Sequence, residues 1–134
     1  MNYLVEVKKL KKSYGSKEAV NGISFNIEED QILGLLGPNG SGKTTTIGML
    51  LGLLKPSAGE IKINKMNFEN SRIDILSKIN FISPYIELPK KLTVKQNLIV
   101  YGKLYNIKNL DERIQYLTEK LRLEDLLNRI TGEL

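Results

Sequence analysis

The fold of this chain is decided by one stretch, Gly37-Pro38-Asn39-Gly40-Ser41-Gly42-Lys43-Thr44. It matches the pattern G-x-x-x-x-G-K-[ST], in which backbone N–H groups of a glycine-rich loop surround phosphate oxygens. The three glycines allow a tight turn and leave no Cβ between the backbone and an anion. Where such a loop leads into a helix, the helix N-terminus also attracts the phosphate. The pattern therefore predicts a phosphate-binding loop at residues 37–44.

Three side chains after the glycines complete the predicted site. Lys43 is expected to place a positive charge on the β- and γ-phosphates of a nucleotide, and the Thr44 hydroxyl to ligate Mg²⁺. Thr45, one residue further into the helix, can donate to an α-phosphate oxygen. A glycine-rich turn that only caps a helix is the alternative interpretation. The residues favour the nucleotide site, because a bare turn requires neither Lys43 nor Thr44.

The segments on both sides of the loop have the patterns of a strand and a helix. The continuous apolar run at 32–36 predicts a strand that is buried on both faces. After the loop, apolar residues at i, i+3, i+4 and i+7 predict one face of a helix that Pro56 ends. Those residues are Ile47, Leu50, Leu51 and Leu54. Strand, loop and helix in this order predict an α/β fold.

Alternating apolar and polar residues predict further strands. They occur at 5–8 and 23–28, and the turn residues at 15–16 between them indicate an antiparallel pair. Residues 61–64 alternate in the same way, and 80–82 form another short candidate strand. From Thr93 the apolar period becomes helical, with stripes across 94–105, 114–121 and 123–130. Thr93 with Gln96 fits a capping box, and Asn109 with Glu112 resembles one.

The composition excludes several classes of protein. The 134 residues fit one compact domain, and 41% apolar and 26% charged residues are typical of a globular chain. Neither cysteine nor histidine occurs, which excludes disulfide scaffolds, thiolate zinc sites and histidine acid–base chemistry within this sequence. No apolar run is long enough to span a bilayer, and the N-terminus lacks the basic region and apolar core of a secretory signal. We therefore expect a soluble cytoplasmic protein.

The charge is mildly basic, with a net value of +5. The densest basic cluster consists of Lys8, Lys9, Lys11 and Lys12. No aromatic residues interleave these lysines in the way that a single-strand binder requires. We interpret the cluster as a solvated strand end, and we expect no nucleic-acid partner.

The sequence resembles the nucleotide-binding subunit of ATP-binding cassette (ABC) transporters over nearly its whole length. Besides the loop and its flanks at 32–54, the resemblance rests on segments 12–15 (KSYG), 19–25 (AVNGISF), 56–61 (PSAGEI) and 92–98 (LTVKQNL). It is closest to ATPase subunits of exporters that have a separate membrane subunit. It implies a P-loop NTPase core with an N-terminal antiparallel β subdomain at 1–92. The beginning of the α-helical subdomain would follow at 93–134.

The resemblance also implies ligands and partners. These are ATP and Mg²⁺, an integral membrane permease subunit at the inner face of the cell membrane, and a second nucleotide-binding subunit paired head to tail. Tyr14 matches the aromatic residue that stacks on adenine, whereas its position alone leaves stacking and packing equally open. The expected ATP-binding residues are Tyr14, Gly37, Pro38, Asn39, Gly40, Ser41, Gly42, Lys43, Thr44 and Thr45. Thr44 is the expected metal ligand, and Lys43 would stabilise charge on the γ-phosphate.

Two departures from the family pattern bear on activity. The strand after the P-loop helix usually ends in a glutamine that senses the γ-phosphate, but Ser83-Pro84-Tyr85 align there. The Walker B strand with its Asp and Glu, the Leu-Ser-Gly-Gly-Gln signature and the switch histidine are not found in the sequence. We therefore expect the N-terminal portion of such an ATPase, with the C-terminal half of the fold missing. It would hold half a site and would not hydrolyse ATP alone.

Several alternatives remain beside this interpretation. A remnant of a decayed transporter gene and a soluble non-transport ABC ATPase share the same motifs. A small nucleotide kinase is disfavoured, because such kinases usually begin with the strand that leads into the loop. In the family, the Walker B strand lies beside the strand at 32–36. Without it that strand would have an exposed apolar edge, so we expect the isolated chain to be marginally stable or prone to aggregate.

Overall fold

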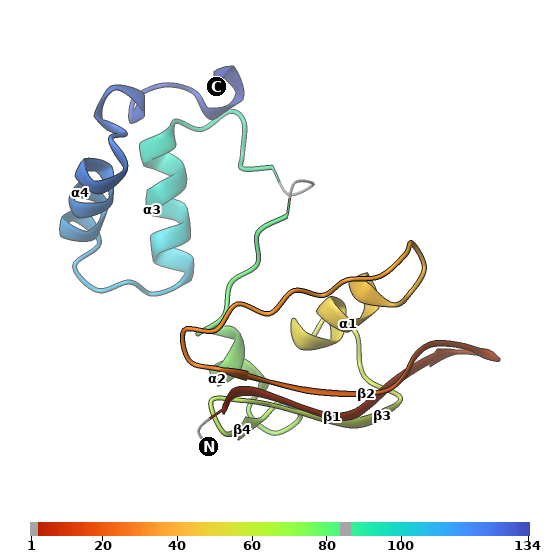
Figure 1. Cartoon of the computed structure of the whole chain (residues 1–134). Coiled ribbons are helices and arrows are strands. Elements are labelled where there is room, and N and C mark those ends of the chain that lie inside the picture. The colour runs from red at the N-terminus through yellow and green to blue at the C-terminus, as the bar shows by residue number, and fades with distance from the viewer. Residues whose placement is uncertain (1–2, 84–86) are drawn as a thin grey trace. The chain divides into compact units, whose positions relative to one another are not determined.

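A computed structural model describes residues 3–83 and 87–134 of the chain (Figure 1). The chain divides into two compact units, Met1–Phe81 and Ile82–Leu134. In its described residues the first unit combines a four-stranded sheet with two short α-helices. The part of the second unit that the structure describes consists of two longer α-helices and two 3-10 turns. None of the described helices is long and apolar enough to cross a membrane.

The sheet of the first unit is antiparallel and has the strand order β2-β1-β3-β4. Its longest strands form the hairpin of β1 (Tyr3–Tyr14) and β2 (Lys17–Glu28), joined by a two-residue turn at 15–16. β3 (Ala58–Ile63) pairs with the other side of β1, and the short β4 (Met66–Asn67) pairs with β3. The structure confirms the predicted hairpin and the predicted strand at 61–64.

A bulge interrupts β1 at Lys9. This residue has φ 47°, and its backbone N–H leaves the ladder to donate to Ser24 Oγ at 2.8 Å. Gly59 of β3 faces the bulge with φ 92°, and a Cβ there would lie 2.4 Å from the Lys9 carbonyl oxygen. The backbones of β1 and β3 can approach this closely only because residue 59 is glycine.

The core of the first unit joins the sheet to both of its helices. α1 (Lys43–Leu50) contributes Met49 and α2 (Arg72–Leu76) contributes Ile75, and both side chains are fully buried. The buried cluster consists of Val7, Leu10, Val20, Met49, Ile61, Ile63 and Ile75. The apolar faces of the predicted strands therefore do point into the core, and Met49 near the end of α1 packs in the same cluster.

α1 ends earlier than the sequence pattern predicts. Its last helical residue is Leu50, and Gly52 follows in the left-handed conformation with φ 66°. The Gly52 N–H donates to the Met49 carbonyl and the Leu53 N–H to the Gly48 carbonyl, which is the hydrogen-bond pattern of a Schellman motif. A glycine C-cap thus ends the helix before Pro56 can.

The strand predicted at 32–36 is absent, and this expectation was wrong. Residues 31–38 have no regular structure, and Ile32 and Leu36 are 96% and 93% exposed. The short strand expected at 80–82 is absent too. A strand persists only when its backbone N–H and C=O groups have partners. Neither segment pairs with a strand of the described sheet, which ends at β2 and β4.

The second unit is built around α3 (Val94–Leu104) and α4 (Leu110–Leu121). The predicted capping box at the start of α3 is confirmed. Thr93 Oγ1 accepts from the Gln96 N–H at 3.2 Å, and Gln96 Oε1 accepts from the Thr93 N–H at 2.9 Å. Two orphan donors of the helix end are thereby satisfied.

Two other helical expectations were wrong. Asn109 takes the left-handed conformation with φ 51° and makes no side-chain cap; its amide donates instead to the Glu112 carboxylate at 3.2 Å. The stripe at 123–130 contains one 3-10 turn, Glu124–Leu126, rather than a third helix, and a second 3-10 turn, Thr131–Glu133, follows it. The segment between them pairs with the start of α3, through the N–H groups of Val94 and Lys95.

The capping box gives a first testable prediction. Thr93→Ala removes the acceptor of the Gln96 N–H and is expected to lower the free energy of unfolding by about 1 kcal/mol. Ser71→Ala is the matched control, because Ser71 occupies the N-cap of α2 without a side-chain cap. Urea titration followed by circular dichroism measures both variants. Equal stability of the two variants would show that the box at Thr93 contributes nothing.

Candidate functional site

The glycine loop ends at Gly42, which is the N-cap of α1 and has φ 90°. A Cβ on this residue would lie 2.3 Å from the carbonyl oxygen of Ala19 in β2. The Gly42 carbonyl accepts from both the N–H and the hydroxyl of Thr46, at 2.8 and 2.9 Å. The strand β2 therefore fixes the position of the loop, and the first turn of α1 starts at a defined point.

The other two glycines make the turn itself. Gly40 has φ 82°, and Gly37 has φ 153° with space for a Cβ closed off by Ser41 Oγ at 2.6 Å. The Ser41 N–H donates to the Pro38 carbonyl at 3.2 Å and closes a tight turn. The structure thus gives the loop at 37–42 the backbone conformation for which the glycines were singled out.

Lys43 folds back over this loop. Its Nζ donates to the carbonyl oxygens of Gly37 and Pro38, at 2.6 and 2.8 Å. The first turn of α1 contains no acidic residue. The positive end of the helix and the Lys43 ammonium are therefore not neutralised within this turn, which favours an anion at this place.

Thr44 and Thr45 lie in the first turn of α1, where backbone N–H groups have no partner within the helix. Thr44 is exposed and Thr45 is half-buried. The hydroxyl of Thr46 is bonded to Gly42, so it is not available to a ligand in the same way. The loop, Lys43, Thr44 and Thr45 thus come together as predicted, and their glycine cradle fits a phosphate group.

Tyr14 lies at the end of β1, beside the turn of the hairpin, and is 51% exposed. Figure 1 shows this turn and the glycine loop at the same end of the first unit. The register explains the proximity, because Lys12 pairs with Val20, and Val20 Cγ2 lies 3.0 Å from the place where a Gly42 Cβ would be. Tyr14 stands two residues, or about 7 Å, beyond Lys12 along the same strand.

Two contributors to the site were missed in the sequence. Ala19 lies against Gly42, and Lys12 Nζ lies over the Tyr14 ring, 5.1 Å from its centroid. The alternation of a strand places residues i and i+2 on one face, so Lys12 could have been paired with Tyr14 in advance. Nothing local to Ala19 points to its contact, because it depends on how β2 meets the loop.

A magnesium ion has one candidate ligand here. Thr44 is a hydroxyl at the mouth of the loop, and the described residues contain no group of three or more acidic side chains that could hold a metal. Mg²⁺ keeps several water ligands and is commonly bound together with substrate phosphates. The residues therefore fit Mg²⁺ only as a companion of a nucleotide. Pro84, which aligns with the glutamine of the family, lies outside the described residues.

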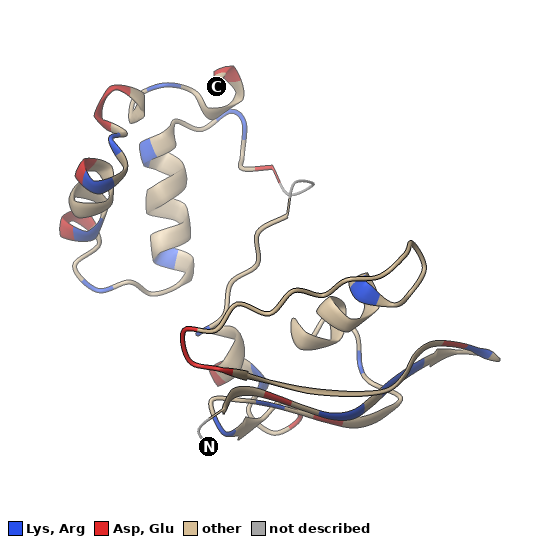
Figure 2. Cartoon of the chain, viewed as in Figure 1, with Lys and Arg blue, Asp and Glu red and all other residues tan. Residues whose placement is uncertain are grey.

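The basic cluster of β1 stands among acidic residues. Lys8 Nζ lies 3.5 Å from a Glu6 carboxylate oxygen on β1, and Lys62 Nζ lies 3.5 Å from Glu60 on β3. Figure 2 shows positive and negative positions interleaved along these strands. Lys8 and Lys62 thus each have an acidic partner on their own strand.

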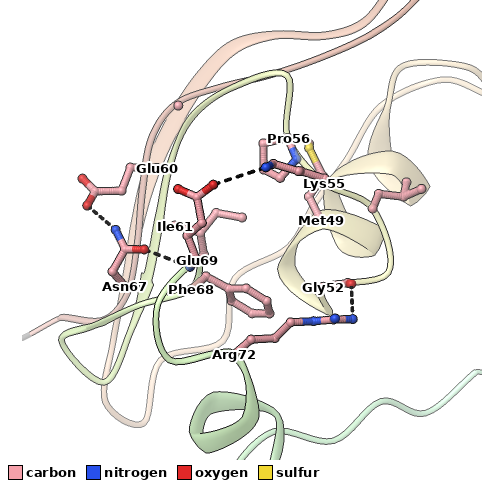
Figure 3. Close-up of a pocket in the computed structure, with 12 residues that line it drawn as sticks. Met49, Gly52, Lys55, Pro56, Glu60, Ile61, Asn67, Phe68, Glu69 and Arg72 are labelled. Atoms are coloured by element: carbon pink, nitrogen blue, oxygen red, sulfur yellow. Dashed lines mark hydrogen bonds and ion pairs between the residues drawn. The ribbon is translucent and has the colours of Figure 1, made fainter.

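A separate pocket lies beyond the C-terminal end of α1, away from the glycine loop at its N-terminal end (Figure 3). Its volume is about 280 Å³, and apolar lining comes from Met49, Leu54, Pro56, Ile61 and Phe68. Its polar side chains bond to one another or to the backbone. Lys55 lies 3.4 Å from Glu69, Asn67 donates to Glu60 at 2.8 Å, and Arg72 donates to the Gly52 carbonyl at 2.9 Å. These groups are already paired, so the nucleotide site is not placed here.

Comparisons with known proteins identify the family of this chain. Residues 20–134 match the family described as ABC transporter. The Nod factor export ATP-binding protein I of Paraburkholderia xenovorans is 36% identical over 132 residues, which are 97% of this chain and 43% of the relative. The bacitracin transport ATP-binding protein BcrA of Bacillus licheniformis is 40% identical over 110 residues, 80% of this chain and 35% of the relative. The chain thus spans less than half the length of these relatives.

Solved structures share the fold. One described as the ATP-binding subunit of an ABC transporter superposes with a TM-score of 0.82 at 27% identity, covering 95% of this chain and 54% of that one. CbiO1 from Clostridium perfringens, part of the ABC transporter complex CbiONQ, gives 0.83 at 26% identity, covering 100% and 56%. The α/β fold is thus the P-loop fold of ABC ATPases, with the N-terminal antiparallel sheet. The chain belongs to the ABC transporter family.

Proposed function

We propose that this chain forms the nucleotide-binding half-site of an ATP-binding subunit that drives export through an ABC transporter. The observation that carries the proposal is the loop at 37–42, which leads into the N-terminus of α1 with Lys43 folded over it. The proposed ATP-binding residues are Tyr14, Gly37, Pro38, Asn39, Gly40, Ser41, Gly42, Lys43, Thr44 and Thr45.

Each part of the site has a role in this proposal. Loop N–H groups and the start of α1 bind the phosphates, and Lys43 exchanges its two carbonyl acceptors for β- and γ-phosphate oxygens. Thr44 ligates Mg²⁺, which when bound neutralises charge on the phosphates. Thr45 donates to the α-phosphate, and the exposed ring of Tyr14 stacks on the adenine.

The relatives support an exporter. Their names refer to Nod factor export and bacitracin transport, which concern those proteins. For this chain we propose no particular transported substrate. We propose an ATP-binding subunit at the inner face of the membrane that contacts a permease and a second nucleotide-binding subunit. Residues 1–92 would form the ATP-binding core and 93–134 the beginning of the helical subdomain.

We further propose that the 134 residues bind MgATP without hydrolysing it. Water attack on a γ-phosphate needs a group that orients the water, and a carboxylate or glutamine usually does so. No carboxylate is among the proposed residues of the half-site. We therefore expect this chain to bind MgATP and to release no phosphate from it.

The test measures thermal unfolding and phosphate release on the same chain. MgATP at about a hundred times its dissociation constant should stabilise the folded state by roughly 2.7 kcal/mol, which raises the melting temperature by several degrees. Phosphate release should stay at the level of a protein-free sample. A chain that is not stabilised by MgATP would refute the half-site. Turnover that disappears in Lys43→Ala would refute the separation of binding from hydrolysis.

A further inference from the structure

Lys12 and Tyr14 form a pair on the strand end nearest the glycine loop. Lys12 and Tyr14 stand two residues apart on β1, so their side chains share one face of the strand, although the pairing with β2 shifts register between Leu10 and Lys11 and between Lys12 and Ser13. Leu10, two residues before Lys12, is fully buried in the core cluster that also contains Met49 of α1. The Lys12 ammonium lies 5.1 Å from the centroid of the Tyr14 ring, within the range of a cation–π contact.

The Lys12 side chain is held from a second direction. Its Nζ donates to the carbonyl oxygen of Lys55 at 2.7 Å, in the segment that follows α1. Two backbone contacts fasten the same place: the Ser57 N–H donates to the Lys11 carbonyl at 2.8 Å, and the Ser13 N–H donates to Ser57 Oγ at 3.0 Å. The ammonium is therefore anchored to the backbone beyond α1 and is not a free surface charge.

We propose that Lys12 is a positioning residue for the base of the nucleotide. It holds the Tyr14 ring on the loop side of the hairpin and covers one side of it, so that the other side is presented to the adenine. This inference rests on the proposed function, because it assigns a role within the same nucleotide site. Tyr14 is half exposed and otherwise free to rotate away, and a stacking ring binds well only when its orientation is fixed in advance.

The pair predicts a specific effect on binding. A cation–π contact at an exposed site is worth a factor of about two to five in an equilibrium constant. Lys12→Met keeps the apolar stem and removes the charge, so it should raise the dissociation constant of MgATP by about two- to fivefold. Magnesium tripolyphosphate has no base, and its dissociation constant should change by less than about twofold, because Lys12 does not act through the phosphates.

Three further variants of the full chain keep the proposal falsifiable. Lys11→Met removes the same charge from the neighbouring position on the opposite face of β1 and should leave both dissociation constants unchanged. Lys12→Arg keeps a cation over the ring and should restore MgATP binding. In a Tyr14→Ala background, Lys12→Met should have no further effect, which makes the two residues a thermodynamic pair.

Titration calorimetry with MgATP and with magnesium tripolyphosphate measures all of these constants. Unchanged MgATP binding in Lys12→Met would overturn the proposal. An equal loss for both ligands would overturn it as well, since Lys12 would then act on the phosphates or on the fold. A wild-type chain that binds neither ligand would instead refute the nucleotide site itself and this inference with it.

Discussion

Gly42→Ala is expected to destabilise the first unit by about 2–5 kcal/mol. The residue has φ 90°, and the new Cβ would lie 2.3 Å from the Ala19 carbonyl oxygen. The left-handed conformation alone costs an alanine about 1–2 kcal/mol. Overlap with a backbone atom adds about 1–3 kcal/mol, because neither β2 nor the start of α1 can move without disturbing the core.

The consequence reaches the proposed nucleotide site. The Gly42 carbonyl accepts from the N–H and the hydroxyl of Thr46, so a displaced Gly42 also displaces the first turn of α1. A small domain has only about 5–15 kcal/mol of stability. We therefore expect urea unfolding, followed by circular dichroism, at a clearly lower midpoint, together with loss of stabilisation by MgATP.

Gly40→Ala is the matched control for this effect. Gly40 has φ 82°, but a Cβ there would meet nothing within 4 Å. The two variants therefore share the conformational cost and differ in the collision with β2. Gly40→Ala should cost only about 1–2 kcal/mol. If both variants unfold at the same urea concentration, the contact between Gly42 and β2 is not what fixes the loop.

The parts of the fold that the sequence predicted correctly depend on local chemistry. The hairpin of β1 and β2 follows from two alternating runs and a turn, and the box at Thr93 follows from two side chains three residues apart. The glycine loop follows from residue types that only a special backbone requires. Each of these patterns has a local physical cause, so it can be interpreted without knowing which distant segment it contacts.

The predictions that were wrong concern segments whose structure depends on distant partners, which a local sequence pattern does not identify. The apolar run at 32–36 indicates a preference for burial, but a strand also needs neighbours, and Ile32 and Leu36 are exposed in their absence. The same limit applies to Ala19, whose contact with Gly42 exists only after β2 and the loop have met. Sequence patterns thus predict which segments can pair, and the structure decides which of them do.

Helix ends were predicted unevenly for a related reason. Asn109 can cap a helix through its side chain or occupy the left-handed conformation, and both uses favour the same residue. The structure chooses the second, with φ 51°. Gly52 ends α1 before Pro56, because a left-handed glycine at this position satisfies the last carbonyl groups of the helix. Gly52 lies nearer to the helix than Pro56, so it is the glycine that ends α1.

Lys43→Ala is expected to weaken MgATP binding by about ten- to a hundredfold. The Lys43 ammonium already donates to two loop carbonyls at 2.6 and 2.8 Å, so it is held where phosphate oxygens would replace them. A hydrogen bond to a charged group is worth about 1.5–3 kcal/mol, which corresponds to this loss of affinity. Alanine removes the charge and leaves the glycine cradle intact.

Thermal unfolding at one fixed MgATP concentration makes this loss visible. At about a hundred times the wild-type dissociation constant, MgATP raises the free energy of unfolding of the wild-type chain by about 2.7 kcal/mol. The same concentration raises that of a variant with hundredfold weaker binding by only about 0.4 kcal/mol. Lys78→Ala is the control, because it removes one exposed lysine charge after α2, outside the loop, and should keep the full stabilisation. An equal loss in Lys78→Ala would mean that total charge attracts the nucleotide. Full stabilisation of Lys43→Ala would mean that the loop amides bind it without the ammonium.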